Sequence, residues 1–207
     1  MKKRIVYFSV LFVVIIAMII GTSWANRRKI YTTTDIATYT KKEKDLYLIP
    51  DYNDALMVFP DSINDNMVVN DYYRIKVKQG FTTVGFHKVL DITYSSDAYN
   101  SEIQRLEGWR REYRYNNTQG SAGFLYDENN FEYPAFVAAY NCVIEYEYAL
   151  ILGNYRILYV YIRAIHKGES PLLDEQLPKN YFEKNLSLDG FSYSIYHNQY
   201  MWEYDNP

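Results

Sequence analysis

The chain has few of the residue types that most often mark a catalytic or metal site. Its 207 residues include one cysteine, Cys142, and three histidines. A single cysteine excludes an intrachain disulfide, and a nucleophilic cysteine needs a histidine nearby. His87, His166 and His197 stand far apart in the sequence with no motif around them. We therefore interpret Cys142 as a small buried residue or a turn residue.

Motifs for catalysis are also missing. The sequence has no nucleophile elbow, no phosphate-binding loop, no paired Cys/His metal spacing and no His-Glu metal helix. We accordingly assign no catalytic residue, no metal and no cofactor, and we assign no enzymatic activity. An enzyme is not excluded, because an active site can assemble from residues that are distant in the sequence.

The first 25 residues predict a membrane segment. A positive leader at residues 2–4 precedes an uncharged apolar run, Ile5–Gly21. Small residues at and before Ala25 fit a signal-peptidase site, but the run extended through Ala25 reaches the roughly 20 residues that span a bilayer. The basic residues 27–29 then disfavour translocation and cleavage there. We expect an uncleaved single-pass anchor in the cell membrane with the C-terminal domain outside the cytoplasm. Secretion after cleavage following Ala25 is the alternative.

The charge beyond this segment is acidic. Removing the three leader cations from the 22 basic residues leaves 19 against 25 acidic residues, a net charge of −6. Nucleic acid binding requires a basic surface, so we expect no nucleic acid partner. The expected partners are the membrane, through Ile5–Gly21, and an envelope polymer or a protein.

The rest of the chain reads as a spacer and one domain. Residues 26–45 are polar and rich in Thr and Lys without a sustained period, which predicts a juxtamembrane spacer that lifts the domain off the membrane. Residues 46–207 suffice for a single domain with a substantial core. The 24 tyrosines accompany many residues with AT-rich codons, which is typical of an AT-rich bacterial genome.

Apolar periodicity predicts an α+β fold, with one antiparallel sheet of about five to six strands and one main packed helix. The helix is predicted at Ser95–Glu107, with Gly108 placed to end it. Its apolar stripe, at spacings i, i+4 and i+7, consists of Tyr99, Ile103 and Leu106. Strands are predicted at 72–77, 83–94, 136–140 and 191–196, and in a hairpin within 136–165.

That hairpin carries the longest apolar runs outside the leader. Gly153-Asn154 is typical of a two-residue turn, because glycine accepts the positive φ that such a turn requires. With these two residues at the centre, Tyr148 would lie opposite Tyr159 and Leu150 opposite Ile157. A slip of one residue would exchange the faces, so the pairing depends on the turn.

One basic aromatic cluster is the candidate ligand-binding site. Its members are Trp109, Arg110, Arg111 and Arg114. Arginines interleaved with aromatic rings can hold a phosphate-bearing or anionic wall polymer. A solvated edge, or a contact to the acidic remainder of the domain, is the alternative that we favour.

Two glutamates of the hairpin form a second candidate. Glu145 and Glu147 are two residues apart on a strand and therefore share a face, as an acid/base pair or a cation site would require. The alternative that we favour is a solvated patch, or partners for Arg156 and Arg163. An active site would have to join several of Glu145, Glu147, Asp91, His87 and His166 in one pocket.

Together these observations favour an extracytoplasmic binding or interaction module, anchored in the membrane or secreted. The alternatives are an extracytoplasmic hydrolase whose active site has no motif, and an accessory or regulatory subunit of a membrane complex.

Overall fold

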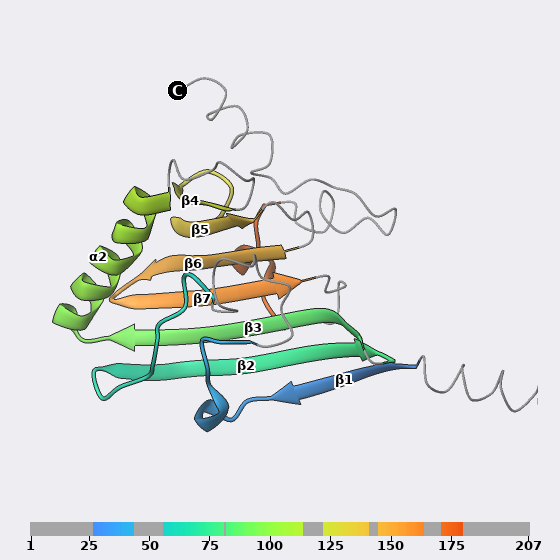
Figure 1. Ribbon diagram of the computed structural model, residues 1–207. Helices are drawn as coiled ribbons and strands as arrows, with labels where there is room; N and C mark the ends of the chain where they lie inside the picture. Colours follow the sequence, from blue (N-terminus) through green and yellow to red (C-terminus); the bar gives the residue numbers. More distant parts are fainter. Residues whose placement is uncertain are drawn as a thin grey trace, which may run out of the picture.

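The computed structural model describes residues 27–43, 56–80, 82–113, 122–140, 145–163 and 171–179 (Figure 1). Within these ranges, seven strands form one antiparallel sheet in the order β1-β2-β3-β7-β6-β5-β4, and one α-helix, α2, packs against its core. An α+β fold with an antiparallel sheet is therefore confirmed. The predicted span at Ile5–Gly21 lies outside the described residues, and no helix within them is long and apolar enough to cross a membrane.

The sheet has more strands than the five to six that the sequence predicts. Two of them, β1 and β4, were not predicted, because each has only six residues and mixes polar with apolar side chains. The predicted strand at 191–196 lies outside the described residues. The strands are β1 (Arg28–Thr33), β2 (Met67–Gln79), β3 (Thr82–Tyr94), β4 (Ala122–Asp127), β5 (Ala135–Tyr140), β6 (Glu145–Gly153) and β7 (Arg156–Arg163). The helix α2 spans Ser96–Tyr113, and the short 3-10 helices η1 and η3 span Ile36–Thr38 and Asp174–Gln176.

Each face of the sheet carries its own apolar core. Side chains alternate along a strand, so Phe86 and Leu90 of β3 enter one core, whereas Val89 enters the other. The first face is covered by α2 and by a buried segment without helix or strand, Leu56–Pro60, which we call the strap. Figure 1 shows the teal segment that leads into β2 crossing in front of β3 and β7. Phe131 and Leu177 belong to the core on the second face.

The stretch expected to be a spacer contains an ordered strand. Residues 28–33 pair with β2 in antiparallel register, from Arg28 opposite Gln79 to Thr33 opposite Arg74. η1 follows, and Glu43 further along is buried, with 3% of its surface exposed. Residues 28–43 are therefore part of the folded domain rather than a tether outside it.

The hairpin between β6 and β7 forms, but its register differs by one residue from the predicted one. The turn is centred on Asn154 and Tyr155, with φ of 51° and 62°, and Gly153 precedes it at φ 82°. Leu150 consequently lies opposite Leu158, and Tyr148 opposite Val160. The predicted pairing of Tyr148 with Tyr159 is wrong, because these two side chains point to opposite faces.

The left-handed conformation of Tyr155 has local compensation. A non-glycine residue in this region costs roughly 1 kcal/mol or more. The Tyr155 carbonyl accepts a hydrogen bond from the Tyr94 amide at 2.9 Å, and its ring meets the Tyr99 ring edge-on at 5.4 Å. These contacts tie the turn to the start of α2, so tertiary packing overrides the local preference for Gly153-Asn154 at the turn centre.

The helix is confirmed in its stripe and is longer than predicted. Leu106 is fully buried, and Tyr99 and Ile103 are half-buried against the same core. α2 continues past Gly108 to Tyr113. Glycine costs about 1 kcal/mol inside a helix. Trp109, the next residue, packs on the first core, and this contact offsets part of that cost.

Replacing Leu106 by Ala should lower the free energy of unfolding by about 2–5 kcal/mol, since the side chain is fully buried. Ile103→Ala is the matched control and should cost clearly less, because Ile103 is only half-buried. Urea unfolding of the purified full chain, followed by tryptophan fluorescence, measures both. Equal costs for the two variants would contradict the docking of α2 described above.

Candidate functional site

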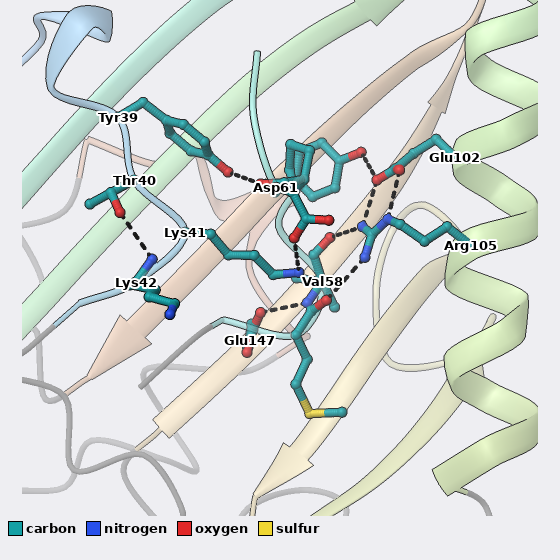
Figure 2. A network of polar contacts seen from close by, with 12 residues as sticks. Tyr39, Thr40, Lys41, Lys42, Val58, Asp61, Glu102, Arg105 and Glu147 are labelled. Carbon is teal, nitrogen blue, oxygen red and sulfur yellow. Dashed lines mark hydrogen bonds and ion pairs between the residues drawn. The ribbon is translucent and has the colours of Figure 1, made fainter. Parts of the chain in front are cut away.

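Charged side chains supply hydrogen-bond partners for the buried backbone of the strap. Its backbone is buried without helix or strand partners, so its N–H and C=O groups need hydrogen bonds from elsewhere. The Val58 amide donates to Oε1 of Glu147 on β6 at 2.6 Å (Figure 2). The guanidinium of Arg105 on α2 donates to the carbonyls of Met57 at 3.2 Å and Val58 at 2.5 Å. Side chains of α2 and of the sheet therefore hydrogen-bond to the strap from two sides.

Arg105 is held in position by Glu102, one turn earlier on α2. Its Nε donates to Oε2 of Glu102 at 2.8 Å and its Nη2 to Oε1 at 2.7 Å, a bidentate pair. Burial alone would lower the pKa of Arg105, but the hydrogen bonds and charge of Glu102 outweigh it and raise that pKa. Arg105 stays cationic wherever the fold is intact.

Two tyrosines complete the surroundings of Glu102. The Tyr159 hydroxyl donates to Oε1 of Glu102 at 2.6 Å and lies 2.6 Å from the Tyr94 hydroxyl. Burial, reinforced by the Glu102 charge, raises the pKa of both tyrosines, so both keep their protons. Because the single Tyr159 proton goes to Glu102, Tyr94 is the donor in the pair of hydroxyls.

A second buried ion pair holds the N-terminal segment on the same face. Lys88 of β3 is fully buried, and its Nζ lies 2.9 Å from Oε1 of Glu43 and also bonds the Thr40 carbonyl. Arg74 reaches the other oxygen of Glu43 at 3.0 Å. Burial lowers the pKa of Lys88, and the Glu43 carboxylate opposes this. The Tyr39 hydroxyl donates to the Pro60 carbonyl at 2.5 Å, which joins this segment to the strap.

We call this set of side chains the clasp, and its chemistry is directed inward. Its members are Glu43, Lys88, Glu102, Arg105 and Glu147. Each of the three glutamates is at most 7% exposed, and its carboxylate accepts hydrogen bonds from groups of the protein itself. Such an arrangement binds backbone and fixes the strap, rather than offering an exposed acid or base to a substrate.

One clasp residue was predicted, but in another role. Glu147 is not part of a solvated patch, because it is fully buried beneath the strap. The register of β6 places it opposite Tyr161 on the strap side of the sheet. Arg156 instead pairs with Asp91, at 2.8 and 2.5 Å. The Glu145 side chain lies outside the described part of the chain.

The residues proposed for a hydrolytic site are not brought together. His87 and Asp91 lie on the second face, with Val89, whereas Glu147 lies on the first. His87 is fully buried and meets the Tyr73 ring edge-on at 5.2 Å. His166 lies outside the described residues. The sheet itself therefore separates Glu147 from His87 and Asp91.

The predicted basic aromatic cluster straddles the end of α2. Trp109 is half-buried and packs against the first core, so much of its ring is committed to the fold. Arg110 and Arg111 follow within the last turn of the helix, but their side chains and all of Arg114 lie outside the described residues. The role of the three arginines stays a prediction.

Most of the clasp was missed at the sequence level. Lys88 gave a usable signal, since it is a lone cation among Phe86, Leu90 and other apolar residues on one strand face. Glu102 and Arg105 sit at i and i+3 on a helix, which is common on solvated surfaces and therefore uninformative. Glu43 lies in a polar stretch that carries no pattern.

Comparison with known proteins gives no match to a family model, a curated protein or a solved structure. Within the described ranges, no three His, Cys, Asp or Glu side chains come together as metal ligands. The function proposed below therefore rests on the sequence and on the described geometry.

Replacing Arg105 by Met should lower the free energy of unfolding by roughly 3 kcal/mol, because it leaves Glu102 buried without its cation and uncovers two strap carbonyls. Asp61→Asn is the matched control. It removes the Lys41–Asp61 ion pair, whose carboxylate is 80% exposed, and should cost less than about 1 kcal/mol. Chemical denaturation compares the two, and similar small losses would show that the clasp does not hold the strap.

His87 should make the fold sensitive to acid. Burial lowers its pKa to about 3, and neither ring nitrogen has a hydrogen-bond partner among the described residues. Below pH 6.5, His87 binds a proton in the unfolded chain but stays neutral in the native state. The free energy of unfolding therefore falls as the pH falls from 6.5 towards 3. Between pH 7.5 and 5 this loss is about 2 kcal/mol.

The variant His87→Leu lacks this proton and should lose about 2 kcal/mol less than the wild type over the same pH interval. Unfolding of both proteins at pH 7.5 and pH 5 gives the difference directly. Parallel losses in the two proteins would mean that His87 is protonated in the native state.

Proposed function

We propose that this protein is a membrane-tethered extracytoplasmic binding module that takes a protein partner by strand addition at one edge of its sheet. The predicted span at Ile5–Gly21 supplies the tether, and secretion after Ala25 remains the alternative. The net charge of −6 beyond the leader supports a partner other than nucleic acid.

The exposed edge formed by β1 carries this proposal. Residues 28–32 are all exposed, including Ile30 at 57% and Tyr31 at 53%. An edge strand presents backbone donors and acceptors on its outer side, where an extended segment of another protein can pair. Ile30 and Tyr31 project to opposite faces and can contact side chains of the added strand on both sides.

A second stretch of sheet edge lies along β2, one strand inward from β1. β1 covers only Arg74–Gln79 of β2, and the earlier half of β2 runs on beyond Thr33. Val68 in that half is 65% exposed. The binding surface, which we call the open edge, therefore comprises β1 and Met67–Asp71.

The distribution of charge favours one part of the open edge. Charged side chains on an edge discourage pairing, and Arg28 and Lys29 occupy the beginning of β1. Ile30–Thr33 and Met67–Val69 carry no charge. At the opposite edge of the sheet, α2 packs beside the edge strand β4, which leaves less room there for an added strand. A partner strand thus fits best against the uncharged half of the open edge.

Site-specific photo-crosslinking of the full chain in its native membranes tests this function. The crosslinking residue benzoylphenylalanine is placed at Ile30, at Thr32, at Arg111 on the predicted basic helix end, and at Leu173 as an exposed control. Strand addition predicts adducts at Ile30 and Thr32 to residues two apart on one partner segment, because these positions share a face. No adduct is expected at Leu173.

The variant Tyr31→Lys places a charge on the edge strand, which discourages pairing, and should therefore abolish the adducts. The unfolding midpoint should not change, since Tyr31 is 53% exposed. Adducts from Arg111 alone would move the binding site to the basic end of α2. Equal adducts from Leu173 would show random contact and contradict the proposal.

A further inference from the structure

The start of β1 lies very near the predicted membrane span. When the predicted span is extended through Ala25, it ends three residues before β1 begins to pair at Arg28. Three residues reach at most about 10 Å. Because Arg28 lies opposite Gln79, the turn at Gly80 between β2 and β3 is at this same end of the sheet.

This end of the sheet is cationic although the domain is acidic. Arg27, Arg28 and Lys29 stand at or before the start of β1, and Lys76 and Lys78 stand on the adjoining part of β2. Lys29 lies opposite Lys78 and Tyr31 opposite Lys76, which places the three lysines on one face. We call these five residues the basic corner.

Within the basic corner, the charge of Lys78 acts on Lys76. Burial and then repulsion from Lys78 lower the pKa of Lys76. Like charges on neighbouring positions gain from a nearby anionic surface, which relieves their mutual repulsion. Such a surface is within reach if the span is in the bilayer.

Resting on the membrane tether of the proposed function, we propose that the basic corner sits on anionic lipid headgroups of the membrane that holds the span. The domain is then seated on the bilayer by the Gly80 end of its sheet, instead of being lifted away by a spacer. The long axis of β2 leads away from the membrane, and the uncharged half of the open edge faces outward, where a partner can reach it.

The location of the basic corner near the bilayer favours lipid headgroups over an acidic peptide as its ligand. A soluble acidic segment would have to enter the roughly 10 Å between the sheet end and the bilayer. Lipid phosphates are already there at high local concentration. Their attraction is electrostatic and therefore weakens with added salt.

Fluorescence quenching with the full chain reconstituted in vesicles tests the seating. In a Cys142→Ser background, a fluorophore is attached at Gln79→Cys near the basic corner, or at Asn66→Cys before the other end of β2. The two positions are about 40 Å apart along an extended strand. The vesicles contain headgroup-labelled quencher lipid, in either phosphatidylcholine alone or a mixture with phosphatidylglycerol.

We expect the Gln79 label to be quenched at least threefold more than the Asn66 label in phosphatidylglycerol vesicles, with a smaller difference in phosphatidylcholine. Lys76→Gln combined with Lys78→Gln should remove the dependence on phosphatidylglycerol. Lys179→Gln, an exposed lysine of another part of the chain, should leave it unchanged.

Two failures are distinguishable. If the chain floats with the vesicles in alkaline carbonate but the two labels are quenched equally, the seating is overturned and the tether stands. If the chain does not float with the vesicles, the tether fails, and the seating that rests on it is overturned as well.

Discussion

The hydrogen bond from the Val58 amide to Glu147 is the contact on which the rest of this fold depends. A buried segment without regular structure can persist only if its backbone groups find partners. Glu147 from the sheet and Arg105 from α2 supply them at 2.6 Å and at 2.5–3.2 Å. Without these bonds, buried backbone groups of the strap would lack partners over the first face.

The charged groups of the clasp restrict how the chain can pack more than they add to the free energy of unfolding. The cost of their desolvation offsets much of their mutual attraction. Removing one member, however, leaves the others buried without a partner. The clasp thus penalises alternative packings of the strap, α2 and the segment carrying Glu43. The function we propose then lies away from it, on the open edge that the rigid sheet presents and the basic corner orients.

Local rules predicted the parts of the fold in which one periodicity dominates. The alternation around Phe86–Tyr94 and the stripe ending at Leu106 were both confirmed. The hairpin register was wrong by one residue, because tertiary contacts of Tyr155 outweighed the glycine preference at Gly153. Glu147 was recognised as unusual, but its partner is 89 residues earlier in the chain, and no local pattern reports such a contact. β1 escaped notice because a short exposed edge strand buries too little to leave an apolar pattern.

Hydrogen exchange at the Val58 amide, measured by NMR on the full chain, tests this account most directly. If the clasp fixes the strap, this amide exchanges only through global unfolding, as slowly as that of Leu158 in the centre of the sheet. Its free energy of exchange should then fall in step with global stability as denaturant is added. Exchange of Val58 at the rate of an exposed loop would contradict the account, because it would show that the strap opens while the sheet stays folded.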